Sequence, residues 1–291
     1  MKFTIFTPAY NRAYTLGRLY DSLRKQTVIN FEWLIVDDGS TDNTPELCAT
    51  FESDLFPVRY YRVQNQGKCA AINKGAELAH GEWFYIVDSD DWLPEDAMER
   101  LTAEEKLIES ERVGVLCGMR HYPSGERIGG NLSFSRVECT AFDFRYRMKV
   151  KGDLAEVIRT EVVRENLYPQ FSDEHFCPVA VLFNRIALKH LTHYFNQNIY
   201  YCKYLPDGLT AHITKVRMES PKATLICYAE QAACPVPFAL KVRSWINFWR
   251  FGFCLQQKDF MKRFRIPLWA WLCWLPGWLM HRRDCKSLNK K

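Results

Sequence analysis

Strand-like and helix-like patterns alternate over the first 120 residues, and this alternation constrains the fold more than any other feature of the chain. The apolar segments KFTIFTP, EWLIVDD, VRYYRVQ and EWFYIVD have the composition of strands. Between them, Leu16, Leu19 and Leu23 recur at helical spacing, and GKCAAINKGAELAHG has the composition of a helix built from small residues. Alternating strands and helices predict a parallel sheet with crossover helices, and therefore an α/β fold.

Clusters of polar residues follow each of these four strands. They lie at residues 7–12, 37–41, 67–68 and 88–91. In parallel sheets of this kind, ligands bind at the edge where the carboxyl ends of the strands meet. We therefore expect the four clusters to converge on one crevice.

The last cluster, DSDD after the apolar run FYIV, holds three carboxylates within four positions. Like charges this close repel one another unless a cation or strong donors lie among them. Asp88 and Asp90 are two residues apart on an extended segment and so point to the same side. Oxygen ligands without histidine or cysteine suit Mg²⁺ or Mn²⁺, an ion commonly shared with substrate phosphates. We expect Asp91 to be a turn or capping residue before the next helix.

The other clusters each allow two interpretations. Asp37 and Asp38 precede a glycine turn, where they could form the turn or accept the ring N–H of a uracil-type base. Lys68 follows Gly67, where it could supply a positive charge to a diphosphate or be a solvated side chain. The residues alone leave both pairs of interpretations open.

Two phosphate-binding motifs are absent from the sequence. No G-x-G-x-x-G follows the first strand, and no G-x-x-x-x-G-K-[ST] occurs anywhere in the chain. These absences disfavour a dinucleotide oxidoreductase and a P-loop NTPase. The first loop also differs from the glycine-rich start of sugar-1-phosphate nucleotidyltransferases.

Taken together, four motifs resemble the inverting family 2 glycosyltransferases of GT-A fold. They are TPAYNR (7–12), VDDGSTDNT (36–44), NQGKCAAINKG (65–75) and VDSDD (87–91), in the family's order and at about its spacings. The resemblance covers roughly the first 100 residues. It implies a Rossmann-like, mostly parallel central sheet flanked by helices, and a nucleotide-diphosphate sugar as donor, with UDP favoured as the nucleotide.

The resemblance also implies roles for individual residues. Asp88 and Asp90 would bind Mn²⁺ or Mg²⁺, and Pro8, Tyr10 and Asp38 would surround the base. The full set of expected nucleotide-sugar-binding residues is Thr7, Pro8, Tyr10, Arg12, Asp37, Asp38, Gly67, Lys68, Asp88 and Ser89.

Members of this family carry an acidic general base downstream, and the segment YPQFSDEHFCPVAVLFNRIA offers Asp173 and Glu174. It resembles the version in which a single glutamate precedes an aromatic residue and an LFNR-like helix, which favours Glu174. His175 stands where many relatives have aspartate. Attack by a deprotonated acceptor hydroxyl on the anomeric carbon, with a metal-bound diphosphate as leaving group, would invert the sugar's configuration.

These expectations define a function and two alternatives. The leading function is a metal-dependent hexosyltransferase that acts on a hydroxyl of a glycan or lipid-linked acceptor in cell-surface polysaccharide synthesis. A metal-dependent nucleotidyl or phosphoryl enzyme could use the same cluster of carboxylates at residues 88–91. An inactive transferase-like domain that only binds a nucleotide or a partner is the second alternative.

Charge and tryptophan divide the chain into two parts. Residues 241–291 hold twelve Lys and Arg against two Asp, a net charge of +10, and six of the nine tryptophans. We therefore expect a GT-A domain over 1–235, with a nucleotide-sugar half of about 1–120 and an acceptor half of about 121–235. A basic, tryptophan-rich, amphipathic helical tail would follow at 236–291.

The tail has the composition of an interfacial membrane segment. Its apolar run IPLWAWLCWLPGWLM is too short to span a bilayer, and Pro276-Gly277 should interrupt a helix there. Upstream, Val242, Trp245, Trp249 and Phe253 share a helical stripe among basic residues, a pattern drawn to anionic lipids. Packing of the tail on the catalytic domain or on a second subunit is the alternative. Nucleic-acid binding is not expected, because no recognisable binding motif is present.

Cysteine usage and the first residues bear on the compartment. Eleven cysteines are scattered with no CxxC pair and no zinc-type spacing, which predicts reduced, mostly buried thiols. The opening MKFTIFTPAYNR lacks the features of a secretory signal. We expect a cytoplasmic protein, peripheral to the cytoplasmic face of the membrane.

Overall fold

The computed structural model describes residues 1–130, 134–203 and 212–288. The chain forms two compact units, one of Met1–Leu167 with Ile186–Tyr204, the other of Tyr168–Arg185 with Leu205–Lys291. The last three residues of the expected tail, 289–291, lie outside the described residues.

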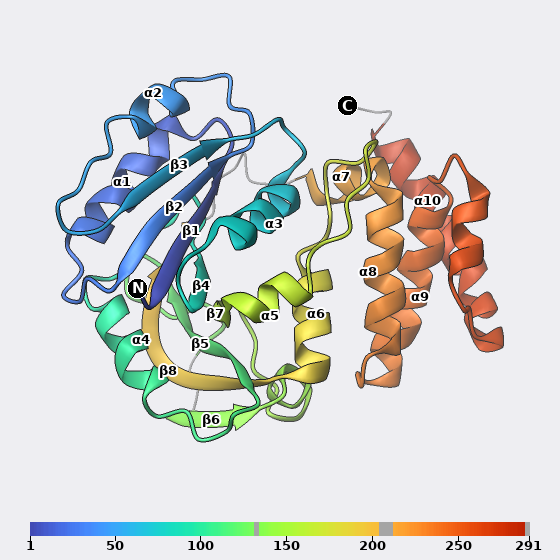
Figure 1. Cartoon of the computed structure of the whole chain (residues 1–291). Helices are drawn as coiled ribbons and strands as arrows, with labels where there is room; N and C mark the ends of the chain where they lie inside the picture. Colours follow the sequence, from blue (N-terminus) through green and yellow to red (C-terminus); the bar gives the residue numbers. More distant parts are fainter. Residues whose placement is uncertain (131–133, 204–211, 289–291) are drawn as a thin grey trace. The chain divides into compact units, whose positions relative to one another are not determined.

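The first unit is built on a mixed sheet that has eight strands among the described residues, in the order β3-β2-β1-β4-β7-β5-β8-β6 (Figure 1). Its first four strands are parallel, β7 is antiparallel between β4 and β5, β8 is parallel to β5, and β6 is antiparallel to β8. This is the mostly parallel sheet predicted from the sequence. The strands are β1 (Phe3–Ala9), β2 (Phe31–Asp37), β3 (Val58–Arg62), β4 (Trp83–Ile86), β5 (Val113–His121), β6 (Arg136–Cys139), β7 (Leu154–Arg159) and β8 (Leu191–Tyr201).

The register of the parallel strands brings the polar clusters to one edge. Ala9 of β1 lies beside Asp37 of β2, and Asp37 lies beside Arg62 of β3. On the other side of β1, Phe6 pairs with Ile86, so β4 ends at the same edge. The expected convergence of the strand ends is confirmed, because neighbouring parallel strands carry their carboxyl ends to the same side.

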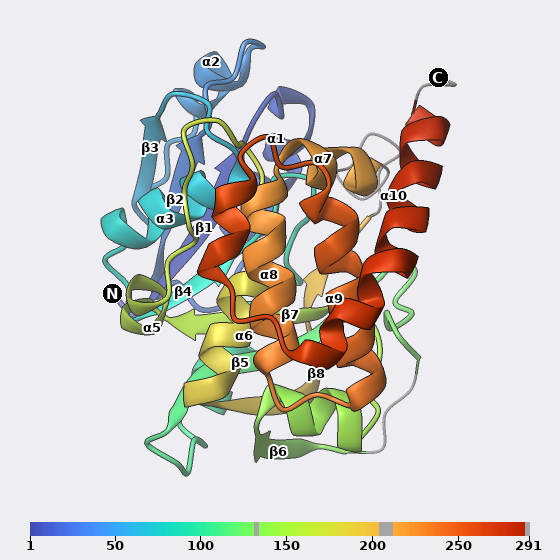
Figure 2. The same cartoon turned by 90° about the vertical axis from the view of Figure 1, so that its right-hand side faces the viewer.

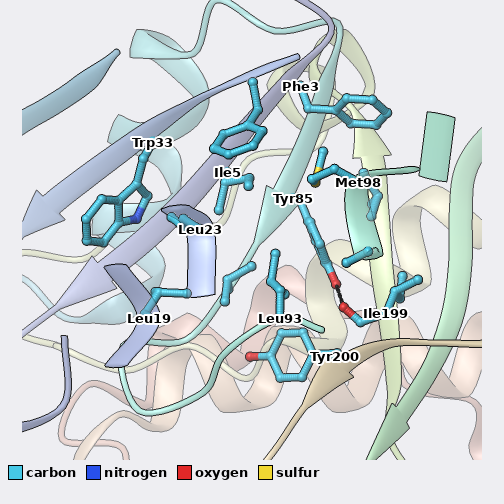
Figure 3. Packing of buried hydrophobic residues seen from close by; sticks show 14 of the residues in the cluster. Phe3, Ile5, Leu19, Leu23, Trp33, Tyr85, Leu93, Met98, Ile199 and Tyr200 are labelled. Atoms are coloured by element: carbon cyan, nitrogen blue, oxygen red, sulfur yellow. Dashed lines mark hydrogen bonds between the residues drawn. The ribbon is translucent and has the colours of Figure 1, made fainter. Parts of the chain in front are cut away.

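Helices cover both faces of this sheet. Successive residues of a strand point to opposite faces, so Ile5 and Tyr85 face Leu19 of α1 and Met98 of α4, where the main core lies (Figure 3). Phe6 faces α3 and lies so close to Gly75 of that helix that a Cβ on residue 75 would be 2.1 Å from the Phe6 ring. The helical segments are α1 (Ala13–Arg24), α2 (Thr44–Cys48), α3 (Lys68–Leu78), α4 (Ala97–Glu105), α5 (Thr160–Glu165) and the π-helix η1 (Asp143–Arg147).

The second unit is helical. In Figure 2 its helices α8, α9 and α10 run alongside one another. The helix α6 (Ala180–Lys189) crosses the division between the units. The other segments are α7 (Ile213–Glu219), α8 (Pro221–Ala233), α9 (Phe238–Gly252), the 3₁₀ turns η3 (Lys258–Arg263) and η4 (Leu268–Cys273), and α10 (Trp274–Leu288). Because α8 packs along α9, this unit begins upstream of the boundary expected at residue 236.

The tryptophans of α9 form the core of the helical unit. Trp245 and Trp249 are each 5% exposed and pack with Leu225 and Tyr228 of α8. The stripe that the sequence suggested for a lipid surface is therefore largely internal, because the helix α8 covers it. No helix within the described ranges is long and apolar enough to cross a membrane.

The expected interruption at Pro276-Gly277 is wrong. The helix α10 begins at Trp274, so Pro276 lies in its first turn, where a backbone N–H has no partner within the helix and its absence costs little. Gly277 lies against α9, and a Cβ there would fall 2.6 Å from that of Trp249. None of the eleven cysteines, all of which lie in the described residues, forms a disulfide, and eight of them are buried.

Candidate active site

The loops that follow β1 and β2 are bonded to each other. Asn11 adopts the left-handed conformation (φ 53°), and its side-chain oxygen accepts a hydrogen bond from the Thr41 N–H at 2.8 Å. In return, the Asn11 N–H donates to Ser40 Oγ at 2.8 Å, and the Arg12 N–H donates to Thr44 Oγ1 at 3.0 Å. The first two sequence motifs thus form one structural element at the sheet edge.

Asp37 and Asp38 both organise the backbone around them. Asp37 is fully buried and accepts hydrogen bonds from the Ser40 N–H at 2.8 Å and from the Tyr60 hydroxyl at 2.7 Å. Asp38 accepts from the N–H groups of Gln66 and Gly67, both at 2.8 Å. The structure thus contains the turn geometry of the first interpretation. Contact of Asp38 with a nucleotide base stays a prediction.

Lys68, the first residue of α3, forms an ion pair with the acidic cluster. Its Nζ lies 2.6 Å from Asp88 Oδ1. Burial by itself would raise the pKa of Asp88, but the positive charges of Lys68 and of Arg120 outweigh burial and lower it. The Asp88 carboxylate is therefore held in its ionised form among cationic groups.

Asp90 is the other carboxylate of the expected metal pair. Burial, together with the negative charge of Asp88, raises the pKa of Asp90. The Asp90 carbonyl accepts a hydrogen bond from the Arg18 guanidinium, which also stacks over the Trp92 ring at 4.1 Å. Arg18 thus fixes the main chain at Asp90, whose carboxylate remains next to a like charge.

Asp91 closes a turn, as expected, because its N–H donates to the Asp88 carbonyl at 3.1 Å, but it does not cap the next helix. It is 4% exposed and accepts hydrogen bonds from the Tyr200 hydroxyl at 2.8 Å and the Lys203 N–H at 3.2 Å. The helix α4 begins only at Ala97, and its N-cap residue makes no side-chain capping bond. Burial and the charge of Asp88 raise the pKa of Asp91 to about 6. Asp91 instead attaches the acidic loop to the end of β8.

Sequence reasoning missed three residues that shape this loop: Arg18, Arg120 and Tyr200. Arg120 of β5 lies over the Tyr200 ring at 4.1 Å and donates from Nε to the Leu154 carbonyl at 2.7 Å. The Tyr200 hydroxyl also accepts the Asp88 N–H at 3.0 Å. Arg120 and Tyr200 come from strands beyond residue 112, where the sequence pattern gave no register from which their proximity could have been predicted.

The remaining predicted ligands differ in accessibility. Thr7 is fully buried, and its hydroxyl accepts a hydrogen bond from the Trp33 indole at 3.0 Å. Ser89 is 5% exposed, whereas Tyr10, just after β1, is 47% exposed. Pro8 lies in β1 beside Val36 of β2. The Arg12 guanidinium contributes to lowering the pKa of Asp88, so its charge reaches the acidic loop.

The donor set suits a divalent cation shared with a substrate. Asp88 and Asp90 offer oxygen ligands, which Mg²⁺ and Mn²⁺ prefer. Within residues 1–130, 134–203 and 212–288, no group of three or more His, Cys, Asp or Glu side chains could enclose a metal ion. Mg²⁺ sites with few carboxylates commonly share the ion with substrate phosphates and water.

The two candidate bases lie in the helical unit. Glu174 is 8% exposed, and its two carboxylate oxygens accept the N–H groups of Lys222 and Ala223 at 2.6 and 2.9 Å. Glu174 thereby caps the N-terminus of α8, where a negative charge is favoured. Burial raises its pKa despite these two bonds. Asp173 is exposed and pairs with Lys222 Nζ at 2.6 Å.

Comparison with known sequences gives a family match over most of the chain. The family described as Glycosyl transferase family 2 matches residues 4–191. Glycosyltransferase GlyA of Streptococcus pneumoniae is 37% identical over 108 residues, which are 37% of this chain and 15% of GlyA. For GlyG of the same organism the identity is 35% over 132 residues, 45% of this chain and 42% of GlyG. The chondroitin synthase of Pasteurella multocida is 40% identical over 141 residues, 47% of this chain and 14% of that enzyme. The chain thus spans less than half the length of these relatives.

Solved structures share the fold at low sequence identity. Staphylococcus aureus TarS 1-349 in complex with UDP-GlcNAc has a TM-score of 0.62 and 18% identity, covering 95% of this chain and 79% of TarS. The mannosyltransferase PcManGT of Pyrobaculum calidifontis, in complex with GDP-Man and Mn²⁺, has a TM-score of 0.57 and 17% identity, with 90% and 73% coverage. These likenesses establish a GT-A-like fold.

Proposed function

Because the chain belongs to glycosyl transferase family 2 and is a glycosyltransferase, we propose that it moves a hexosyl group from a UDP-linked donor to an acceptor hydroxyl with inversion. One observation carries the proposal. Asp88 and Asp90 follow β4 at the edge where β1 and β2 also end, and the Lys68 ammonium lies 2.6 Å from Asp88. A pair of carboxylates beside a fixed cation suits a metal-bound diphosphate better than it suits a neutral ligand.

The loops at this edge would bind the nucleotide. Tyr10 is exposed and offers a ring surface to a base, and Asp38 lies in the neighbouring loop, where its carboxylate accepts the N–H groups of Gln66 and Gly67. Lys68 would turn from Asp88 toward the diphosphate. The UDP and UDP-GlcNAc complexes of TarS favour a uridine nucleotide, and the GDP-Man complex of PcManGT marks guanosine as the competing choice.

Asp88 and Asp90 would hold Mn²⁺ or Mg²⁺, which when bound neutralises charge that develops on a departing diphosphate. Arg18 and Tyr200 would keep the main chain of the acidic loop in place for that role. We assign proton abstraction from the acceptor hydroxyl to Glu174, the base that the family resemblance favours, and burial raises its pKa. A positioned base typically contributes about 10²–10⁴-fold in rate.

For the acceptor we propose a glycan or lipid-linked hydroxyl in cell-surface polysaccharide synthesis. The chondroitin synthase similarity supports an extended carbohydrate product. The acceptor must supply a nucleophilic hydroxyl to the base. A sugar at the end of a glycan and a sugar attached to a lipid both carry such hydroxyls.

A combined binding and product assay tests the proposal. Thermal unfolding is measured with UDP-glucose, UDP-GlcNAc, UDP-galactose and GDP-mannose, each with Mn²⁺ or with EDTA. A ligand at 100 times its Kd stabilises the fold by about 2.7 kcal/mol, so binding is readily detected. We expect stabilisation by at least one UDP-sugar with Mn²⁺ and its loss in EDTA. Stabilisation by GDP-mannose alone would refute the uridine assignment.

Mass spectrometry of the products separates the remaining alternatives. Transfer predicts a glycosidic product together with UDP. Release of phosphate or pyrophosphate without a glycosidic product would identify a nucleotidyl or phosphoryl enzyme. Nucleotide binding without any product from a panel of glycan and lipid-linked acceptors would favour a binding domain.

A further inference from the structure

The segment from η4 into α10 exposes an unusual number of large apolar side chains. Leu268 is 90% exposed and Leu272 is 81% exposed, although leucine is normally buried. Leu275 and Leu279 of α10 are likewise exposed, at 54% and 55%. We call the following set the apolar stripe: Leu268, Trp271, Leu272, Trp274, Leu275, Leu279 and Met280.

The other side of this segment is firmly packed within the helical unit. Ala270 is fully buried and Cys273 is 5% exposed. The Ala270 carbonyl accepts a hydrogen bond from the Trp249 indole at 2.9 Å. The stripe is thus the outer face of a folded element, whose inner face already contacts α9.

Basic residues flank the apolar stripe on both sides along the chain. Exposed Lys262, Arg263 and Arg265 precede it, and exposed Arg282, Arg283 and Lys286 follow it. The acidic residue nearest to the second group, Asp284, is bonded to Arg250 of α9 at 2.5 and 2.9 Å. Lys262 is paired with Asp259 at 2.7 Å, but the remaining basic residues leave an excess of positive charge on both sides of the stripe along the chain.

We propose that the apolar stripe and its basic flanks dock on an anionic lipid surface. Leucine and tryptophan would enter the boundary between headgroups and acyl chains, while the flanking Lys and Arg would contact acidic headgroups. Charge complementarity favours an anionic lipid surface over another protein, because the flanks on both sides of the apolar stripe along the chain carry positive charge. The helix would lie in the plane of the interface, since α10 has only 15 residues and no described helix could span a bilayer.

Flotation with vesicles tests the docking surface without reference to sugar transfer. The full chain is mixed with vesicles of phosphatidylcholine and phosphatidylglycerol (3:1) or of phosphatidylcholine alone. We expect flotation with the anionic vesicles, weakened at high salt because screening reduces the attraction of the basic flanks. The double variant Leu268→Ser/Leu272→Ser should bind at least tenfold more weakly. Its matched control is Leu55→Ser/Leu107→Ser, two exposed leucines of the first unit, which should bind as the wild type does.

A second measurement does not depend on these variants. Tryptophan fluorescence of the wild type should be quenched by brominated lipid in anionic vesicles, and Trp271→Phe, at a position 53% exposed, should reduce the quenching. The proposal is overturned if the wild type fails to float with anionic vesicles or floats equally with neutral ones. It is also overturned if the double variant floats as well as the wild type does. A dimer in light scattering that the double variant abolishes would also overturn it, by assigning the stripe to a second copy of the chain.

Discussion

The hydroxyl of Tyr200 donates a hydrogen bond to the carboxylate of Asp91 at 2.8 Å. The same oxygen accepts the N–H of Asp88 at 3.0 Å. Tyr200 lies on β8 and the two aspartates follow β4, so one side chain attaches the candidate metal-binding loop to a strand more than 100 positions away in sequence. The position of Asp88 and Asp90 therefore depends on a residue that would not itself contact the substrate.

Replacing Tyr200 by Phe should loosen this loop. Leaving the Asp91 carboxylate and the Asp88 N–H without this partner should cost about 1–3 kcal/mol of unfolding free energy. We expect kcat/KM for sugar transfer to fall roughly tenfold, as one positioning contact of about 1.4 kcal/mol would cause. The control is Tyr85→Phe, which removes a hydrogen bond to the Ile199 carbonyl in the adjoining core. Equal losses of activity in both variants, in steady-state kinetics, would indicate a general effect on the fold.

Asp90→Asn should abolish metal-dependent donor binding without unfolding the protein. Burial and the charge of Asp88 raise the pKa of Asp90, so removing its charge relieves repulsion in the metal-free fold. We expect an unchanged or higher melting temperature and no stabilisation by a UDP-sugar with Mn²⁺. Transfer should fall by more than about 10²-fold, since charge stabilisation in a transition state is worth several kcal/mol. Exposed Asp54→Asn serves as the control, and retained Mn²⁺-dependent binding in Asp90→Asn would refute the metal assignment.

Lys68→Gln should raise KM for the donor more than it lowers kcat. The variant removes a cation 2.6 Å from Asp88, which the diphosphate would otherwise contact, and about a tenfold rise corresponds to 1.4 kcal/mol of binding. Lys68→Arg should restore part of the loss. Lys74→Gln on the same helix removes an exposed ion pair with Glu77 and should leave KM unchanged. An unaltered KM in Lys68→Gln would show that Lys68 does not contribute to donor binding.

The candidate bases can be distinguished by conservative substitutions. Glu174→Gln should lower kcat by about 10²–10⁴-fold, the range for a general base. It should also destabilise the helical unit by roughly 0.5–2 kcal/mol, because one of the two capping bonds of α8 is lost. Asp173→Asn removes only an exposed ion pair with Lys222 and should keep both rate and stability. If kcat of Glu174→Gln falls only in proportion to the fraction of unfolded protein, Glu174 only caps α8 and the base lies elsewhere.

Glu32 should make stability pH-dependent in acid. It is fully buried on β2 and accepts bonds from Arg59, Thr4 and the His80 N–H at 2.7–2.8 Å. Burial opposes ionisation, but these partners lower the pKa of Glu32 below its ordinary 4.5. A lowered pKa means that the stabilisation is present above pH 4.5 and is lost as pH falls through the folded-state value.

Urea unfolding from pH 7 to pH 3 measures this dependence. Glu32→Gln should lose about 1–3 kcal/mol at pH 7, and the difference from the wild type should shrink below pH 4.5. Glu52→Gln, at an exposed position, is the control and should follow the wild type. A difference between Glu32→Gln and the wild type that stays constant with pH would show that packing, and not ionisation, is responsible.

Local patterns determined the first half of the fold. Apolar periodicity places β1 to β4 and the helices between them, because side-chain direction within a strand or helix depends on residues only a few positions apart. Parallel pairing then carries the segments after those strands to one edge, so Asp37, Asp88 and Lys68 could be grouped from the sequence. The absence of a spanning helix from the described residues also follows from local composition.

Tertiary structure decided what lies around these residues. Arg120 and Tyr200 come from β5 and β8, and nothing within a few positions of either indicates that it meets Asp88 or Asp91. A capping role for Glu174 required the N-terminus of α8, 47 positions downstream at Pro221.

Tertiary structure also decided which apolar residues of the tail are buried. Trp249 lies in an amphipathic helix and Leu272 in an apolar run, both with basic residues nearby in sequence, yet Trp249 is 5% exposed and Leu272 is 81% exposed. A hydrophobic pattern specifies that one side of a helix is apolar. Which of two apolar sides is buried depends on the partner that packs against it, and that partner is set only when distant segments of the chain come together.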